Sequence, residues 1–314
     1  MMRMPKHERG IALLIALLTV ALAAVLIAGL LDRGELALAR TRNALRGEQA
    51  EAYAQALEAY AARILIKDLD DGEQDDHSDL WASPLPPQQV PGGVMLASLT
   101  DLNGCFNLNN LGAGDDGMWL TMFGRLLAAV GVDAEIATAV KDWIGPTDSA
   151  DGFYLAQPLP YRSAQRAFAH VSELRLVRGV TGEVYARLAP YVCALPPGTR
   201  INANTASVPV LQTLGISKAQ AESVWQGGQA HLTAQSLLDL QGIDRRVVSS
   251  NRVGVASSYF LARGDIRLDD VPFTFYSLIE RKEGAIRVVE RSRGSDDALV
   301  AAVGEGAKSG AASR

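Results

Sequence analysis

The chain begins with an apolar run, from Ile11 to Leu31, that contains no charged residue. About 20 apolar residues, at a helical rise of 1.5 Å each, span a hydrocarbon core roughly 30 Å thick. Arg3, Lys6 and Arg9 all precede the run. Cationic residues on the short side favour a cytoplasmic N-terminus and export of the rest of the chain. The pattern therefore predicts a transmembrane helix.

Helical periodicity continues beyond the apolar run. Five apolar residues recur at helical spacing and form an amphipathic stripe, which we interpret as core packing against a sheet; they are Tyr53, Leu57, Tyr60, Ala61 and Ile64. We expect this helix to end near the acidic stretch 68–72, which an acidic, proline-rich loop follows.

Strand-like patterns lie on both sides of a long helical block. Residues 94–100 and 105–108 precede it, and residues 273–281 and 285–291 follow it. The residues between, about 109–262, alternate helical periodicity with short turns. The order predicts an α+β fold, with a small antiparallel sheet interrupted by a large all-α insertion.

The helical block contains a weak repeat. A glycine followed by an aliphatic residue separates two helical stretches at Gly179, Gly215 and Gly242, which is typical of helix–hairpin–helix units. Three serines near the starts of the first helices are expected to cap them, namely Ser172, Ser207 and Ser236.

Nucleic-acid binding is disfavoured by charge. Residues 201–207 resemble the opening of DNA-binding helix–hairpin–helix domains, but the chain carries a formal net charge of −5 and a pI near 5.5. Phosphate-binding hairpins need a second glycine, and that position holds Thr181, Ser217 or Asp244. We therefore expect the hairpins to serve as rigid connectors, with no nucleic acid as partner.

The N-terminal residues are similar to a type IV prepilin signal. A cleaved secretory signal is the alternative, but the apolar run is too long for one and Asp32 follows it directly. In the prepilin class a membrane peptidase cuts after the glycine, here between Gly10 and Ile11, and methylates the new N-terminus. Most members carry a glutamate at the position of Ile15, and a subunit without it suits the first, tip position of a fibre.

Five segments in order extend the resemblance to the K-type minor pseudopilins of type II secretion. They are the leader, residues 102–111, Asp142-Trp143-Ile144, residues 171–177 and residues 201–207, and the resemblance covers about residues 9–292. It implies a long N-terminal helix packed on a small sheet, with an insertion of two sterile-alpha-motif-like (SAM-like) parts.

This resemblance gives the expected organisation of the chain. It comprises a leader (1–10), a transmembrane helix (11–31), the pseudopilin helix and first strands (32–108), two SAM-like parts (109–200 and 201–262), the returning strands (263–293) and a disordered tail (294–314).

The resemblance also implies location and partners. We expect anchoring in the bacterial inner membrane, with the bulk of the chain in the periplasm. The implied partners are the I- and J-type minor pseudopilins, other pseudopilins, the prepilin peptidase and the inner-membrane secretion platform. The implied role is at the tip of the pseudopilus, in its initiation and in export of folded proteins across the outer membrane.

Calcium is the one cofactor that the sequence suggests. Asp142, Asp148 and Asp151 lie on a turn-rich loop, and close carboxylates can bind this hard cation. Members of the family have calcium at their helical domain. A solvated acidic loop is the alternative, since Gly145 stands where the family usually has an acidic residue.

The two cysteines, Cys105 and Cys193, are expected to form a disulfide in an oxidising periplasm. Two buried free thiols are the alternative.

The sequence contains none of the motifs typical of hydrolases, nucleotide-binding enzymes or zinc proteases. We therefore expect that the chain is not an enzyme. Two other functions stay open, a membrane-tethered DNA receptor for uptake and a minor pilin of a type IV pilus.

Overall fold

The computed structural model describes residues 6–72, 74–83, 85–112, 114, 117–146, 151–225, 232–246, 249 and 251–294. The chain forms two units, residues 1–53 and 54–314. The first unit contains most of helix α1, which runs from Lys6 to Asp71 without a break. The end of this helix lies inside the stretch 68–72 that the sequence predicts.

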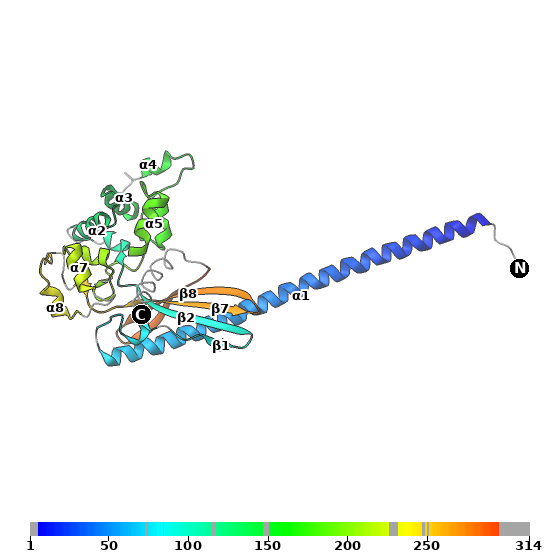
Figure 1. Cartoon of the computed structure of the whole chain (residues 1–314). Coiled ribbons are helices and arrows are strands. Elements are labelled where there is room, and N and C mark those ends of the chain that lie inside the picture. The colour runs from blue at the N-terminus through cyan, green and yellow to red at the C-terminus, as the bar shows by residue number, and fades with distance from the viewer. Residues whose placement is uncertain are drawn as a thin grey trace. The chain divides into compact units, whose positions relative to one another are not determined.

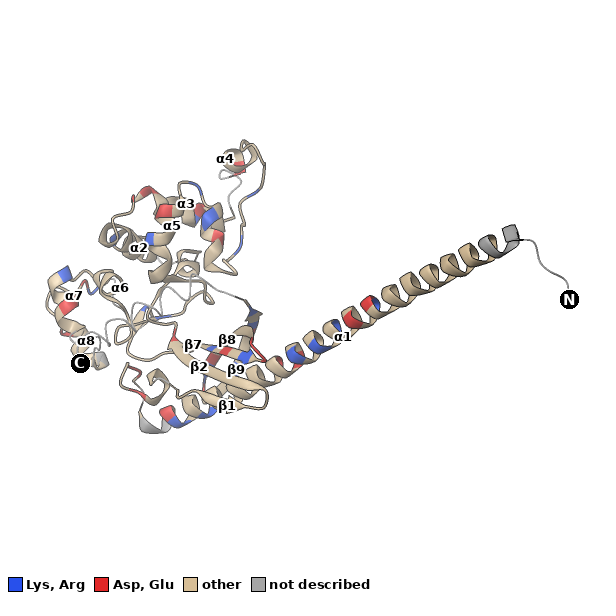
Figure 2. Ribbon diagram, turned by 45° about the vertical axis from the view of Figure 1, so that its right-hand side comes forward, with Lys and Arg blue, Asp and Glu red and all other residues tan. Residues whose placement is uncertain are grey.

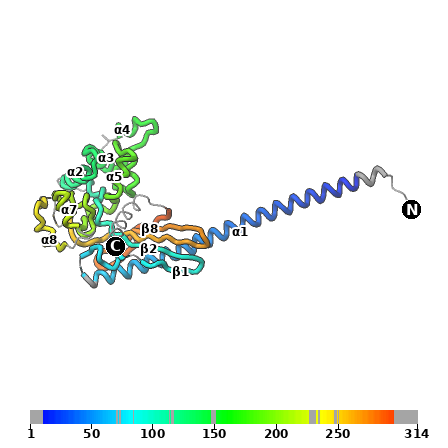
Figure 3. Tube along the Cα trace, in the orientation of Figure 1, coloured from blue at the N-terminus to red at the C-terminus, as the bar shows by residue number. Residues whose placement is uncertain are grey.

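A five-stranded antiparallel sheet forms the base of the second unit, in the order β1-β2-β7-β8-β9. β2 and β7 are neighbours in the sheet, but the whole helical insertion separates them in sequence. Figure 3 shows the chain leaving the sheet after β2 and returning to it as β7 and β8. The strands are β1 (Gln88–Val90), β2 (Gly93–Asp101), β7 (Tyr259–Leu268), β8 (Val271–Lys282) and β9 (Ala285–Arg293).

The insertion consists mainly of short helices, which Figure 1 shows grouped together beside the sheet. They are α2 (Met118–Ala129), α3 (Glu135–Ile144), α4 (Asp151–Leu155), α5 (Gly182–Leu188), α6 (Val208–Gln212), α7 (Lys218–Val224) and α8 (Ala234–Leu238). The insertion also contains 3-10 helices at Leu108–Gly112, Val171–Leu176 and Ala189–Tyr191, and a further one, Leu80–Ala82, precedes β1.

Two pairs of two-residue parallel strands lie where the insertion leaves the main sheet, divides into its two halves and returns to the sheet. We call this region the joint of the insertion. β3 (Phe106–Asn107) pairs with β4 (Val192–Cys193), and β5 (Ile201–Asn202) pairs with β6 (Val253–Gly254). The strand expected at 105–108 is therefore two residues long and lies outside the main sheet. The α+β class, with a long N-terminal helix and an antiparallel sheet, is confirmed.

α1 packs on one face of the sheet. Ala61, Ile64 and Leu65 share a core with Phe260 and Ile279. Leu57 is also buried, as the stripe predicts, but Tyr60 is 50% exposed and lies off the packed face. Two acidic residues, Glu58 and Asp68, occupy the buried face in addition.

Gly264 permits the close approach of α1 to the sheet, since a Cβ atom at this position would lie 3.0 Å from Cδ2 of Leu57. The opposite face of the sheet meets the insertion. A small core there contains Leu102, Leu195, Leu261 and Tyr276. Side chains of β7 alternate between the two faces, so both faces are buried near the insertion.

Candidate functional site: the apolar helix and the joint of the insertion

The apolar run Ile11–Leu31 exposes all of its large apolar side chains, Ile15 among them at 56%. Figure 2 shows no charged residue along this run and a mixture of acidic and basic residues after it. In the part of the chain that the structure describes, α1 is the one helix that is long and apolar enough to cross a membrane. The Thr19 hydroxyl donates to the carbonyl oxygen of Ala16 at 2.9 Å, which satisfies it within the helix.

These features are consistent with single-pass anchoring through α1. The first five residues of the leader lie outside the described residues. Cleavage between Gly10 and Ile11 stays a prediction.

The disulfide expected between Cys105 and Cys193 is present, with the two Cα atoms 5.9 Å apart. Cys105 comes directly before β3 and Cys193 ends β4, so the bond lies beside the first parallel pairing. The bond closes a loop with a sequence separation of 88 and fixes the first half of the insertion to the end of β2.

Buried asparagines crosslink the backbone on the insertion side of this joint. Asn107 accepts from the backbone N–H of Leu195 at 3.0 Å and donates to the carbonyl oxygen of Pro196 at 2.9 Å. Asn109 accepts from the backbone N–H of Phe168 at 2.6 Å. Each amide satisfies a backbone donor and acceptor far away in sequence, as a strand partner would.

Asn202 and Asn204 form a second pair of asparagines whose side chains crosslink distant segments. The Asn202 side-chain amide donates to the carbonyl oxygen of Asp75 at 3.0 Å and to the Ser257 hydroxyl at 2.7 Å. Asn204 pairs with both backbone groups of Leu232, at 2.7 and 3.0 Å. These asparagines belong to the segment that resembles DNA-binding hairpins, and they are fully buried here. The likeness is therefore explained by a structural role.

Two backbone segments approach each other closely at Gly104, which follows Asn103 at this joint. A Cβ atom on Gly104 would lie 2.6 Å from the carbonyl oxygen of Thr205, so only glycine lets the two segments meet. The Thr205 hydroxyl in turn donates to the Asp101 carboxylate. Burial raises the pKa of Asp101 to about 6, against the opposing effect of this bond and of the Asn103 N–H.

A buried arginine gathers two carboxylates where α1 ends. Arg281 donates to Asp68 at 2.8 Å and also to Asp75. Burial raises the pKa of Asp68 to about 7, because it outweighs the hydrogen bond from Arg281 and the neighbouring Asp75 repels a second charge. Asp79 completes a cluster with these two aspartates, but Arg281 already forms ion pairs with both Asp68 and Asp75. We therefore assign the cluster a structural role.

The three hairpin glycines have left-handed backbones, with φ of +81° at Gly179, +95° at Gly215 and +85° at Gly242. This conformation is the one that the sequence pattern predicts for a tight turn. Two of the hairpins contact each other directly, since the backbone N–H of Asp244 donates to the carbonyl oxygen of Leu214 at 2.9 Å.

The side chains at these turns are already engaged. Arg125 of α2 donates to Asp244 at 2.8 Å and to the carbonyl oxygen of Thr213 at 3.1 Å. The Arg125 bond, together with Arg246, lowers the pKa of Asp244 to about 2. A permanently ionised carboxylate at the turn repels phosphate, which supports the connector interpretation.

The prediction that Ser172, Ser207 and Ser236 cap the helices is largely wrong. His170 caps the helix near Ser172, and Thr233 caps the helix that contains Ser236. Ser207 occupies the cap position of α6, but its side chain makes no capping bond. His170 and Thr233 can be recognised as capping residues only once the positions of the helix starts are known.

The structure describes two of the three aspartates proposed as calcium ligands, Asp142 and Asp151. Asp148 lies outside the described residues, and Asp142 is half-buried on α3. Asp151 accepts from the backbone N–H and hydroxyl of Ser163 at 2.9 and 2.8 Å, which lowers its pKa. Arg162 also donates to it at 3.0 Å. Both carboxylate oxygens of Asp151 therefore have partners, and calcium binding by the three residues stays a prediction.

Comparison with known proteins gives one consistent result. Residues 104–197 match the family of type II secretion system (T2SS) protein K. The chain is 34% identical to type II secretion system protein K of Pseudomonas aeruginosa, over 93% of this chain and 94% of that protein. It is 30% identical to the protein of the same name from Pectobacterium carotovorum, over 93% and 98%.

A solved structure agrees with these matches. A chain in the crystal structure of the GspK-GspI-GspJ complex from the enterotoxigenic Escherichia coli type 2 secretion system superimposes with a TM-score of 0.73 and 26% identity. The match covers 82% of this chain and 100% of that chain. The apolar helix and the interrupted sheet, with these likenesses, define a pseudopilin of type II secretion. Within that class, the chain belongs to the type II secretion system protein K family.

Proposed function

We propose that this chain is an assembly subunit, not an enzyme, that forms the tip of the type II pseudopilus. The likeness over 82% of the chain to a member of the GspK-GspI-GspJ complex carries the proposal. It supports I- and J-type minor pseudopilins as direct partners. In this role the tip complex starts the pseudopilus, which exports folded proteins across the outer membrane.

Membrane anchoring follows from α1. Prepilin peptidase removes the leader after Gly10, and Ile11–Leu31 then holds the subunit in the inner membrane beside the secretion platform. The residues after the apolar run lie in the periplasm. The Cys105–Cys193 bond supports this side of the membrane, because disulfides persist in oxidising compartments.

Ile15 supports the tip position. A glutamate at this point in the apolar helix neutralises the N-terminal ammonium of a neighbouring subunit, and an unpaired charge in a bilayer costs several kcal/mol. Ile15 cannot offer that pairing to a subunit above it. The bulk of the insertion between β2 and β7 also suits an end of the fibre better than its shaft.

Co-purification tests the partners. The full chain, co-expressed with the I- and J-type pseudopilins of the same bacterium and extracted in detergent, is expected to elute as one complex with both. Elution of the chain alone under these conditions would refute the assembly proposal.

Gold labelling of the insertion tests the position separately. Label confined to one end of overproduced pseudopili is the expected result. Label distributed along the shaft would refute the tip position while leaving membership of the pseudopilus intact.

A further inference from the structure

Exposed apolar side chains gather on one part of the insertion. Outside α1, eight large apolar side chains of the described residues are exposed, and four of these eight lie between residues 153 and 176. We call these four the apolar patch, and they are Phe153, Leu155, Leu159 and Leu176. Leu159 is the most exposed of the eight, at 84%. Single exposed apolar residues are common, but a group of them rimmed by polar residues marks an interaction surface.

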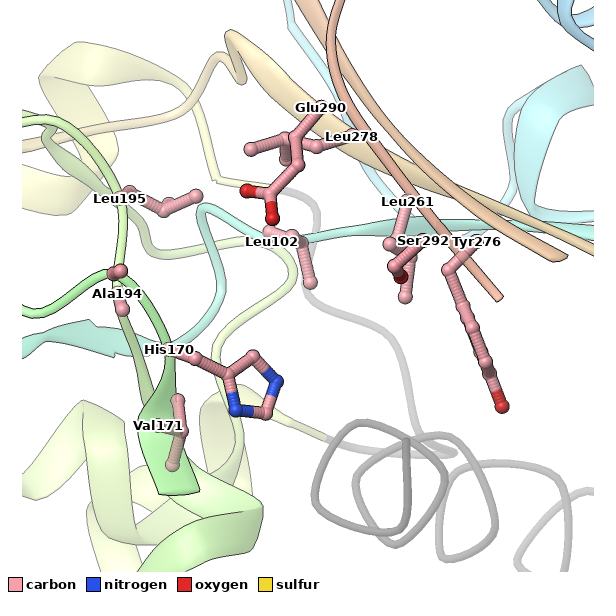
Figure 4. A pocket seen from close by; sticks show the side chains of 11 residues that line it. Leu102, His170, Val171, Ala194, Leu195, Leu261, Tyr276, Leu278, Glu290 and Ser292 are labelled. Carbon is pink, nitrogen blue, oxygen red and sulfur yellow. The ribbon is translucent and has the colours of Figure 1, made fainter. Parts of the chain in front are cut away.

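The pocket between the sheet and the insertion is a different kind of feature. Figure 4 shows Leu195 of the insertion on one side and Leu261 and Leu278 of the sheet on the other. Leu195 and Leu261 are buried and Leu278 is half-buried. The pocket is therefore a gap within the small core between sheet and insertion, whereas the apolar patch faces solvent.

Most of the apolar patch lies on a hairpin that comprises α4 and the loop after it, residues 151–162. Figures 1 and 2 show this hairpin projecting from the other helices of the insertion. The backbone N–H of Tyr161 donates to the carbonyl oxygen of Tyr154 at 3.4 Å and closes the loop. Leu155 and Leu159 lie within the closed loop, and Phe153 lies on α4 directly before it.

The hairpin is fastened to the insertion at its base. Trp143 of α3 packs edge-on against Tyr154, with the ring centroids 5.1 Å apart. The Tyr161 hydroxyl donates to the carbonyl oxygen of Leu176 at 2.9 Å, and the backbone N–H of Arg178 donates to the Tyr154 hydroxyl at 3.2 Å. These contacts fix the apolar patch in place, so little conformational entropy is lost when the patch meets a ligand.

Exposed arginines accompany the apolar patch. Residues 151–178 contain four of them, namely Arg162, Arg166, Arg175 and Arg178. The Arg178 guanidinium lies over the Phe153 ring, 5.6 Å from its centroid. The same stretch has two acidic residues, Asp151 and Glu173, and both accept hydrogen bonds from backbone N–H groups. The stretch therefore carries positive charge, although the formal net charge of the chain is −5.

A lipid surface fits the apolar patch better than a protein does. A stable protein interface uses roughly 20–30 residues on each side, and the patch offers four apolar side chains, three of them on a projecting hairpin. Entry into a lipid interface needs only a few apolar side chains that reach below the headgroups. Arginines suit the headgroup level, because they bind phosphate oxygens with two parallel hydrogen bonds while their stems stay in apolar surroundings.

We propose that the hairpin 151–162 docks on the surface of a phospholipid bilayer that contains anionic headgroups. Phe153, Leu155 and Leu159 enter the interface. Arg162, whose side chain is 72% exposed, and Arg178 contact phosphate oxygens. The subunit thereby gains a second contact with lipid in addition to α1. This contact does not depend on the place of the subunit in a pseudopilus.

Flotation of the full chain with vesicles tests the proposal. The chain is reconstituted through α1 into nanodiscs of phosphatidylcholine, so that the apolar helix is already embedded. The nanodiscs are mixed with vesicles of equal parts phosphatidylethanolamine and phosphatidylglycerol, or with vesicles of phosphatidylcholine alone. Empty nanodiscs give the background.

Three forms of the chain are compared: the natural chain, the double variant Leu155→Ser/Leu159→Ser and a matched control, Leu96→Ser/Leu238→Ser. The control replaces two exposed leucines of the same unit, on β2 and α8, outside the apolar patch. All four leucines are exposed, so the three forms should have the same thermal melt, which shows that the variants are folded.

The natural chain and the control should bind the phosphatidylglycerol vesicles equally. The Leu155→Ser/Leu159→Ser variant should bind at least about tenfold more weakly, because even partial burial of two leucine side chains corresponds to that factor. Binding of the natural chain to phosphatidylcholine vesicles should also be at least about tenfold weaker, because the arginines meet no net negative charge there.

Three results would count against the proposal. Absence of binding by the natural chain above the background would overturn it and leave the apolar patch to a protein partner. Equal binding by all three forms would overturn the assignment of the contact to the hairpin. Equal binding of the natural chain to both kinds of vesicle would overturn the role of the arginines.

Discussion

The backbone N–H of Asn202 donates to the carbonyl oxygen of Asn103 at 2.9 Å, although the first half of the insertion lies between them in sequence. The Asn103 side chain extends this contact. It accepts from the N–H groups of Ser258 and Tyr259 at 3.0 and 2.9 Å and donates to the carbonyl oxygen of Arg200 at 2.9 Å. One residue therefore joins the exit from β2, the middle of the insertion and the return into β7.

Asn103→Ala should lower the free energy of unfolding by about 3 kcal/mol, because the N–H groups of Ser258 and Tyr259 and the carbonyl oxygen of Arg200 lose their partner. Urea unfolding of the full chain in detergent measures this. Asn43→Ala, on the exposed surface of α1, is the matched control and should change stability by less than about 0.5 kcal/mol. Equal effects of the two variants would contradict a special role for Asn103.

Removal of the disulfide should destabilise the second unit. The double variant Cys105→Ser/Cys193→Ser is expected to lose about 4 kcal/mol, because its unfolded chain is no longer restrained by a closed loop with a sequence separation of 88. Thermal melts of the natural chain with and without reductant should differ in the same direction. Identical melts, with the thiols shown to be free, would disprove the stabilising role.

Arg291 of β9 should matter more than its neighbour Arg287. Arg291 donates to both carboxylate oxygens of Glu58, each at 2.6 Å. Burial tends to raise the pKa of Glu58, but bonds from Arg291 and Ser277 bring it below the usual value. Arg287 instead pairs with Glu280 and its side chain is 71% exposed.

We expect Arg291→Ala to cost about 2 kcal/mol, less than a fully buried pair because the Arg291 side chain is 39% exposed. Arg287→Ala should cost less than about 1 kcal/mol. Chemical denaturation of both variants gives the comparison. A larger effect at Arg287 would show that Glu58 does not hold β9 on α1.

Several elements could be predicted from local patterns. The strands expected at 94–100, 273–281 and 285–291 appear with ends shifted by no more than two residues, and α1 ends within the acidic stretch 68–72. The hairpin glycines have the backbone that their spacing predicts. Each of these features depends on periodicity or turn chemistry within about ten residues.

The contacts that fix the insertion could not be predicted in this way. No strand pattern in the sequence predicts β7, and its first residues, 259–262, fall within the expected helical block. Tyr259–Leu268 mixes apolar residues with Arg263, Gly264 and Asp265 and is buried on both faces near the insertion, so it lacks a simple alternation. The asparagine crosslinks join residues about 30 to 155 positions apart. The run Asn107-Leu108-Asn109-Asn110 carried a signal, since so many amides beside apolar residues require buried partners.

Stability should fall as the pH rises from about 5 to about 8. The folded-state pKa values of Asp101 and Asp68 are raised to about 6 and about 7. The folded state therefore binds these protons more tightly than the unfolded state. Their contribution is present below the ordinary carboxyl pKa and is lost as the pH passes through the raised values. Burial lowers the pKa of His77, so the unfolded state binds this proton more tightly than the folded state does. His77 therefore opposes the trend below about pH 6.5.

Asp101→Asn tests the origin of this pH dependence. The variant removes one titrating group, so the slope of unfolding free energy against pH should become less steep by about 1.1 kcal/mol per pH unit near pH 5 and by about 0.7 kcal/mol per pH unit near pH 6. Urea unfolding at several pH values provides the slope. An unchanged slope would show that Asp101 is ionised in the folded chain throughout this range.

A pseudopilin loses its leader after the glycine and keeps the apolar helix as its membrane anchor. The mass of the N-terminal peptide of the protein, purified from bacterial inner membrane, tests whether this chain is processed in that way. The expected peptide begins at N-methylated Ile11. An intact Met1, or a start beyond Leu31, would contradict it.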